Sequence, residues 1–259
     1  MLSAITPVIL TYNEAPNIER TLAALSWAED IVVVDSFSDD GTLEILRAHP
    51  NVRVFQRRFD SHASQWNFAI SQTGIAKEWI LSLDADYVLP APFVDELRKL
   101  QPPVGIAAYS ADFEYCIFGK PLRGSVYPPV TTLFRKSLGE YRQDGHTQRL
   151  NVRGSIGRLS NRIRHDDRKP ISRWLAAQSG YMELEAAKLL ATPNAELSGP
   201  DRIRKTIVLA PALVFFYTLF LRGTILDGKA GLYYAYQRTI AEMILSLHLL
   251  RHYLDPGKP

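Results

Sequence analysis

The fold is decided by residues 5–48, which read ITPVILTYNEAPNIERTLAALSWAEDIVVVDSFSDDGTLEILRA. Two short β-rich runs, Ile5–Leu10 and Ile31–Val34, are each followed by polar residues and then by a helical stretch. In the stretch 17–25, apolar residues recur at helical spacing, whereas the β-rich runs are typical of strands. The segment therefore predicts strand, helix, strand and helix in succession.

The same alternation continues to about residue 90. It adds predicted strands at Val52–Phe55 and Trp79–Leu83 and a predicted helix at Ser61–Thr73. Such alternation favours a parallel sheet covered by helices on both faces, which is an α/β fold. Shorter strand patterns at 106–111 and 131–134 and a helical pattern at 171–190 follow. We predict a catalytic domain over residues 1–190 and a C-terminal helical part over 191–259.

Polar clusters follow three of the predicted strands. They are Thr11-Tyr12-Asn13-Glu14, Asp35–Thr42 and Asp84-Ala85-Asp86. Parallel sheets bind ligands in the crevice beyond the carboxyl ends of their strands, so the three clusters are expected to meet there. No Gly-x-Gly-x-x-Gly pattern follows the first strand, which argues against a dinucleotide-binding dehydrogenase.

The pair Asp84 and Asp86 is the sharpest chemical feature. Two carboxylates separated by one residue can share a divalent cation with a diphosphate, and the cation then neutralises charge on the leaving group. Asp35 ends an apolar strand and is placed to accept hydrogen bonds from a base or ribose. Asp39 and Asp40 fit the capping of the next helix equally well.

Composition limits the function classes. The formal net charge of +3 is too small to indicate nucleic acid binding, and Cys116 is the only cysteine, which fits a reducing compartment such as the cytoplasm. We interpret Ile5–Leu10 as a strand and not a signal peptide, because no basic residue precedes it. The segment 153–173 carries seven basic residues and two acids, and it suits either an anionic partner or a solvated face.

Two apolar stretches lie near the C-terminus. Residues 207–221 form an apolar run that contains Pro211, and residues 232–254 are apolar with interspersed charges. The first is shorter than the roughly 20 residues that a membrane-spanning helix needs. Together they predict a helical pair that packs on the domain or lies in a membrane interface.

The three polar clusters, in this order and spacing, resemble the family 2 glycosyltransferases. The resemblance covers residues 1 to about 190 and is closest to bacterial members that build lipopolysaccharide cores and related surface polysaccharides. It implies a GT-A fold, with a Rossmann-like, mostly parallel sheet flanked by helices. It also implies a UDP-, GDP- or dTDP-sugar donor, Mg²⁺ or Mn²⁺ as cofactor, and inversion at the anomeric carbon.

The resemblance also implies roles for individual residues. The nucleoside would be held by Thr11, Asn13, Glu14 and Asp35. The ribose, diphosphate and metal would be held by Asp84 and Asp86. Gln65 and Asn67 match positions that face the diphosphate in relatives. His165 resembles a histidine that completes the metal shell, although a single histidine is more often structural.

The catalytic base departs from the family pattern. An inverting transfer needs a group that takes the proton of the acceptor hydroxyl. Many relatives supply a glutamate shortly after a histidine, whereas this chain reads Gln143-Asp144-Gly145-His146-Thr147-Gln148. An amide does not titrate usefully, so we expect Asp144 to be the base. His146 could serve instead or orient Asp144, and a loop without any base is the third reading.

The sequence therefore predicts transfer of a sugar to a glycan or lipid-linked acceptor, by an enzyme at the inner face of the cell membrane. Three alternatives stay open. One is a polyprenyl-phosphate sugar synthase, which differs only in its acceptor. Another is a nucleotidyltransferase, although a basic glycine-rich loop after the first strand is missing. The last is a catalytically silent nucleotide-binding scaffold, suggested by Gln148.

Overall fold

The computed structural model describes residues 1–144 and 147–255. They form two compact units. The first comprises residues 1–119 and 127–168, and the second comprises residues 120–126 together with the C-terminal part from Lys169.

The first unit begins with the predicted alternation of strands and helices. After a short 3₁₀ turn at Leu2–Ala4, the elements in chain order are β1 (Ile5–Thr11), α1 (Ile18–Ala23), β2 (Ile31–Asp35), α2 (Thr42–Arg47), β3 (Val52–Gln56), α3 (His62–Gln72) and β4 (Trp79–Asp84). The elements that follow are β5 (Tyr87–Val88), α4 (Ala91–Lys99), β6 (Ile106–Ile117), β8 (Val130–Arg135), a 3₁₀ turn at Lys136–Leu138, β9 (Gly139–Asp144), β10 (Thr147–Val152) and β11 (Ser155–His165).

The main sheet has the strand order β3-β2-β1-β4-β8-β6-β11-β5. The four strands β3, β2, β1 and β4 are parallel neighbours, and β11 is parallel to β6. Strand β8 runs antiparallel between β4 and β6. The predicted α/β fold with a mostly parallel central sheet is confirmed. A separate antiparallel hairpin is formed by β9 and β10.

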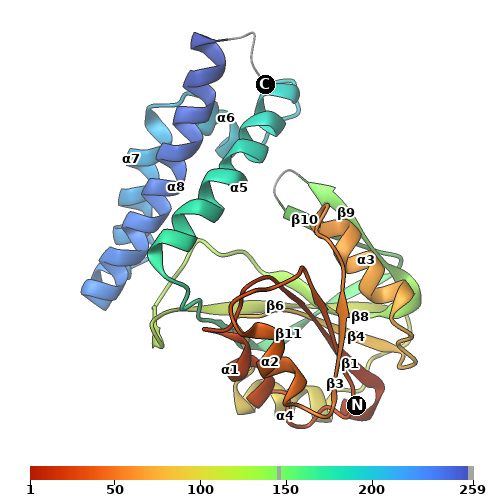
Figure 1. Ribbon diagram of the computed structural model, residues 1–259. Helices are drawn as coiled ribbons and strands as arrows, with labels where there is room; N and C mark the ends of the chain where they lie inside the picture. Colours follow the sequence, from red (N-terminus) through yellow and green to blue (C-terminus); the bar gives the residue numbers. More distant parts are fainter. Residues whose placement is uncertain (145–146, 256–259) are drawn as a thin grey trace. The chain divides into compact units, whose positions relative to one another are not determined.

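Helices cover both faces of this sheet. Side chains alternate between the two faces along each strand, so each face carries apolar side chains that a helix buries. On one face, Ile9, Val33 and Leu81 belong to a core that includes residues of α1, α2 and α4. On the other face, Val8 and Ile80 pack with residues of α3. Figure 1 shows α1, α2 and α4 on one side of the sheet and α3 on the other. Each such buried aliphatic side chain contributes about 1.5–3 kcal/mol of transfer free energy.

The second unit is helical. Its elements are β7 (Lys120–Pro121), α5 (Ile171–Ala191), α6 (Gly199–Lys205), α7 (Leu209–Phe216), a π-helical turn (Tyr217–Leu221), a 3₁₀ turn (Thr224–Asp227) and α8 (Lys229–Leu254). Pro211 lies in the first turn of α7, where its missing N–H is not needed. The predicted helices therefore form, and within residues 1–144 and 147–255 none is both long and apolar enough to cross a membrane.

The boundary between the units differs from the predicted one. We expected the catalytic domain to end at residue 190, whereas the two units divide between Arg168 and Lys169. The reason is helix α5, whose residues Met182 and Leu189 share a core with Leu245 and Leu249 of α8. Because the apolar face of α5 packs on α8, α5 belongs to the same compact unit as α8. Sequence periodicity shows that a helix has an apolar face but not which helix covers it.

Candidate functional site

Three of the predicted site residues lie at one edge of the sheet. Thr11 and Asp35 end β1 and β2 and are directly paired in register. Asp84 ends β4, and its register partner on β1 is Leu10. Because β2, β1 and β4 are adjacent and parallel, their polar ends are neighbours. The structure thus places the three polar clusters together.

Asp35 is fully buried and organises this edge. Its Oδ2 accepts hydrogen bonds from the Thr11 hydroxyl at 2.8 Å and the Ser38 hydroxyl at 2.5 Å, and its Oδ1 accepts one from the Ser38 N–H at 2.9 Å. Three donors compensate the cost of burying the carboxylate. A nucleoside would therefore meet a carboxylate that already accepts three hydrogen bonds.

The loops after β1 and β2 are joined by Asn13, whose backbone is left-handed at φ 57°. Its N–H donates to the Ser38 hydroxyl at 2.7 Å, and its side-chain oxygen accepts from the Asp39 N–H at 2.8 Å. Asparagine tolerates this conformation better than most residues. Asn13 is therefore engaged in holding the two loops together.

Glu14 adds a second link between the same loops. Its N–H donates to the Thr42 hydroxyl at 2.7 Å, and its carboxylate accepts from the Asn17 side chain at 2.9 Å. The Asp40 carboxylate accepts from the Thr42 hydroxyl at 2.6 Å and from its N–H at 3.2 Å, at the start of α2. Asp40 therefore bonds the first residue of α2, whose N-cap position is Gly41.

Asp86 is paired with His165, the last residue of β11. Strand β5 pairs with the end of β11, which places His165 in register with Tyr87. His165 Nε2 lies 3.1 Å from Asp86 Oδ2, and both side chains are largely buried. The imidazole ring is also surrounded edge-on by the rings of Tyr87, Tyr115 and Tyr127.

The electrostatics of His165 follow from this pairing. Burial by itself lowers the pKa of the imidazole, but the nearby carboxylates of Asp86 and Asp84 outweigh burial and raise the net pKa above its ordinary value. Burial also raises the pKa of Tyr87 and Tyr127, whose hydroxyls lie 2.5 Å apart. The His165 ring therefore contacts a carboxylate on one side and the uncharged rings of Tyr87 and Tyr127 on the other.

The predicted metal trio is only partly assembled. Within residues 1–144 and 147–255, no three His, Cys, Asp or Glu side chains are arranged to hold a metal ion. Asp86 and His165 are in contact, whereas Asp84 does not complete a three-ligand group with them. Magnesium sites often use one or two carboxylates and take their other ligands from water and substrate phosphates. The donor set present fits that kind of site.

Gln65 and Asn67 on α3 are held by backbone and side-chain partners. Gln65 Nε2 donates to the Ser36 hydroxyl at 2.9 Å, and its Oε1 accepts from Arg57 at 2.5 Å. Asn67 donates to the Tyr141 carbonyl at 2.8 Å and accepts from the Tyr141 N–H at 2.9 Å. Asn67 therefore anchors β9 to α3 through both its side-chain nitrogen and its side-chain oxygen.

The predicted base lies on the β9–β10 hairpin. Asp144 is the last residue of β9 and forms an ion pair with Arg149 of β10. Gln148 pairs with Gln143 across the hairpin, and Gln143 accepts a hydrogen bond from the Ala63 N–H at 3.2 Å. His146 lies outside the described residues.

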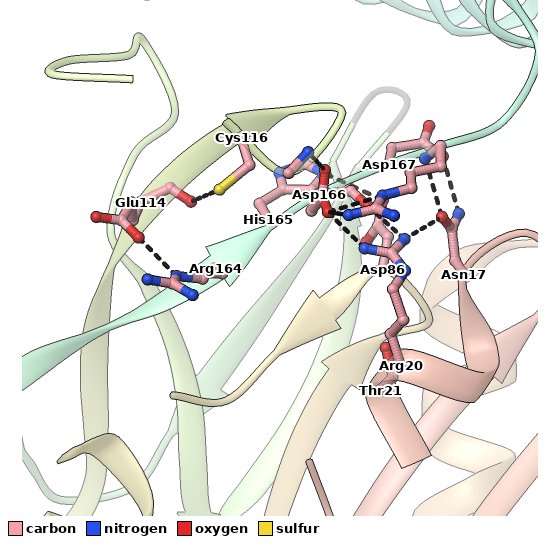
Figure 2. Close-up of polar contacts among 12 residues, drawn as sticks. Asn17, Arg20, Thr21, Asp86, Glu114, Cys116, Arg164, His165, Asp166 and Asp167 are labelled. Atoms are coloured by element: carbon pink, nitrogen blue, oxygen red, sulfur yellow. Dashed lines mark hydrogen bonds and ion pairs between the residues drawn. The ribbon is translucent and has the colours of Figure 1, made fainter. Parts of the chain in front are cut away.

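Sequence reasoning missed a group of residues beside Asp86. Asp166 is 5% exposed and binds Arg20 and Arg168, and Asn17 bonds Asp167 (Figure 2). Asp166 falls in the segment 153–173, whose seven basic residues suit either an anionic partner or a solvated face. Three of its arginines, Arg158, Arg164 and Arg168, are engaged in ion pairs.

Comparison with known proteins supports the family resemblance. Residues 6–116 match the family model for glycosyl transferase family 2, and this segment contains all three polar clusters. An uncharacterized glycosyltransferase of Rickettsia bellii is 34% identical over 97 residues, covering 37% of this chain and 32% of that protein. The lipopolysaccharide core biosynthesis glycosyltransferase LpsC of Rhizobium meliloti is 27% identical over 135 residues, covering 50% of this chain and 47% of that protein.

The chain thus spans between about a third and about half of the length of these curated relatives. Among solved structures, that of S. aureus TarS 1-349 in complex with UDP aligns over 98% of this chain and 92% of that chain, with 16% identity and a TM-score of 0.43. The resemblance to family 2 that the motifs indicated is confirmed over residues 6–116.

Proposed function

We propose that the protein is a glycosyltransferase that moves a sugar from a UDP-, GDP- or dTDP-linked donor to an acceptor hydroxyl, with inversion at the anomeric carbon. One observation carries the proposal. The polar ends of β1, β2 and β4 are neighbours at one edge of the sheet, inside the segment that matches family 2. Parallel sheets bind nucleotides at such an edge.

The donor's nucleoside would lie against Thr11, Asn13, Glu14 and Asp35. Its diphosphate would lie toward Asp84 and Asp86. Mg²⁺ or Mn²⁺ would be held by Asp86 and His165 with the diphosphate oxygens, where it would neutralise charge on the departing nucleoside diphosphate. The buried Asp86–His165 pair supports this assignment, because it brings an imidazole nitrogen and a carboxylate oxygen to within 3.1 Å of one another.

Asp144 would take the proton of the acceptor hydroxyl. In the structure its carboxylate faces Arg149, so the acceptor would have to displace or share that ion pair. The same contact favours the alternative of a silent nucleotide-binding scaffold. Turnover of the wild type and of Asp144→Asn separates the base from the scaffold. If Asp144 is the base, the wild type transfers sugar, whereas Asp144→Asn binds the donor but does not transfer. A scaffold shows no transfer in either protein.

The acceptor would be a glycan or lipid-linked molecule reached at the inner face of the cell membrane. Exposed apolar side chains on α7 and the turn after it support this, and they are Leu209, Leu213, Phe216, Phe220 and Leu221. An apolar helical surface of this kind is suited to a membrane interface. The same surface fits a polyprenyl-phosphate acceptor.

The test is calorimetric titration with UDP, GDP and dTDP, with and without Mn²⁺. We expect one nucleotide to bind tightly and only with metal. If none of the three binds, the transferase proposal fails. If one binds equally well without metal, the transferase proposal stands and the metal site is wrong.

A further inference from the structure

The turn that contains Asp86 is fixed from two sides by groups outside the Asp-x-Asp motif. The buried Thr21 hydroxyl of α1 donates to the Ala85 carbonyl at 2.7 Å. The Asp166 N–H donates to the Asp86 carbonyl at 3.1 Å. The backbone carbonyls of Ala85 and Asp86 therefore each accept a hydrogen bond, one from α1 and one from the segment after β11.

The Asp166 carboxylate connects helix α1 to the segment after β11. Its Oδ2 accepts from Arg20 Nη1 at 2.5 Å and from Arg168 Nη2 at 2.8 Å, and its Oδ1 accepts from the Gly119 N–H at 2.9 Å. Arg20 Nη2 also donates to the Asp166 carbonyl at 2.8 Å. Figure 2 shows Arg20 reaching from α1 to Asp166, beside Asp86 and His165.

Asn17 closes the network at the start of α1. Its Nδ2 donates to Asp167 Oδ1 at 2.8 Å, and its Oδ1 accepts from the Arg168 N–H at 2.9 Å and from Arg20 Nη2 at 2.8 Å. The start of α1 is thus tied to residues 166–168. His165 directly precedes that segment, so any shift of the segment would move the imidazole relative to Asp86.

We propose that Arg20 and Asp166 are positioning residues that hold the Asp86–His165 pair in the geometry needed for metal-dependent diphosphate binding. The inference rests on the proposed function, since it concerns the same site. A buried carboxylate with three donors has one preferred position, because each broken contact leaves a desolvated charge without compensation. The backbone of Asp166 transmits that position to Asp86.

The experiment uses Arg20→Lys and Asp166→Asn in the full chain. Lysine keeps the charge of Arg20 but cannot make several fixed hydrogen bonds at once, and asparagine keeps the size of Asp166 but not its charge. The measured quantity is the gain in affinity that Mn²⁺ gives to whichever of UDP, GDP or dTDP the wild type binds. The affinity for the matching nucleoside monophosphate without metal serves as the internal reference.

We expect both variants to reduce the Mn²⁺ gain by about tenfold or more, which is the usual effect of losing a group that orients a metal ligand. The monophosphate affinity should change by less than about twofold, because Arg20 reaches the predicted nucleoside residues only indirectly, through Asn17 and Glu14. Asp112→Asn is the matched control. It removes the charge from an ion pair between Asp112 of β6 and Arg158 of β11, seven residues before His165, and it should leave the Mn²⁺ gain unchanged.

The inference is overturned if Arg20→Lys keeps the full Mn²⁺ gain. It is also overturned if Arg20→Lys loses monophosphate affinity in the same proportion, since that result indicates a merely structural role. Should Asp166→Asn fail to fold, Arg20→Lys decides alone, as it preserves the charge balance. Failure of the proposed function looks different, because the wild type itself would then bind no nucleotide.

Discussion

His165 Nε2 lies 3.1 Å from Asp86 Oδ2, although the two residues are 79 positions apart in the chain. The contact joins the last residue of β11 to the turn after β4, and the β5–β11 pairing keeps it in place. The second aspartate of the Asp-x-Asp turn thus acquires its partner from outside the segment 6–116 that matches the family. The metal chemistry proposed for the motif therefore depends on a residue beyond that segment.

Loss of His165 should weaken metal-dependent binding. We expect His165→Ala to lower the Mn²⁺-dependent part of diphosphate affinity by about tenfold, because one of two protein donors is removed. Calorimetric titration measures this directly. The control is His49→Ala, which removes a histidine that follows α2 and lies at a similar distance from a carboxylate, 3.2 Å from Glu19. Equal affinities for the two variants would contradict the role of His165.

Replacing the buried Asp35 should destabilise the first unit. In Asp35→Asn, a side-chain amide group meets donors from Thr11 and Ser38, so at least one buried donor loses its acceptor. We expect a loss of about 1–3 kcal/mol in the free energy of unfolding. Urea denaturation measures it. Asp39→Asn, at an exposed position four residues later, should change the free energy by less than about 0.5 kcal/mol.

Phe37 has a left-handed backbone at φ 63° and a side chain that is 50% exposed. That conformation costs a residue with a Cβ about 1–2 kcal/mol, whereas glycine loses roughly 0.5–1 kcal/mol through its freedom in the unfolded chain. Phe37→Gly should therefore raise the free energy of unfolding by up to about 1 kcal/mol. Thermal unfolding checks the sign, and a lowered melting temperature would show that the ring makes stabilising contacts.

Stability should fall at low pH through Asp30. The hydrogen bond from Arg53 lowers the pKa of Asp30 in the folded protein. A depressed pKa stabilises the folded state above the unfolded value of about 3.9, and that contribution is lost as the pH falls through the folded pKa. The wild type should exceed Asp30→Asn by about 0.2–1 kcal/mol at pH 7, since the pair is partly exposed. Urea denaturation at pH 7 and pH 2 should show this difference disappearing; a constant difference would rule it out.

The apolar surface of α7 should govern membrane binding. Phe216 and Phe220 stack on one another and are each 57% exposed. Burying one such ring in a membrane interface contributes about 1.5–3 kcal/mol, so Phe216→Asp should reduce partitioning into vesicles of anionic phospholipid by tenfold or more. Sedimentation with the vesicles provides the readout. Phe59→Asp removes a similarly exposed ring, 52% exposed, from the first unit and should bind vesicles as the wild type does.

The sequence by itself determined the local elements and the positions of their ends. Strands such as Ile31–Asp35 follow from short apolar runs, and the polar clusters after them mark the carboxyl edge of a parallel sheet. The neighbours of Thr11 and Asp35 were predictable because adjacent strand–helix–strand units place successive strands side by side. Periodicity and strand order are local properties, so one sequence carries them.

The tertiary structure alone decided which distant groups meet. The family resemblance placed His165 beside Asp86, but it did not predict their direct contact. Nor did the sequence predict that Asp166 binds Arg20 or that Asn67 anchors Tyr141. Nor does the sequence show that helix α5 packs on α8, which places α5 in the second compact unit. These contacts depend on the pairing of β11 with β5 and β6 and on helix packing between segments far apart in the chain. The free energy of such contacts is shared between two segments, so neither segment's own pattern reveals the partner.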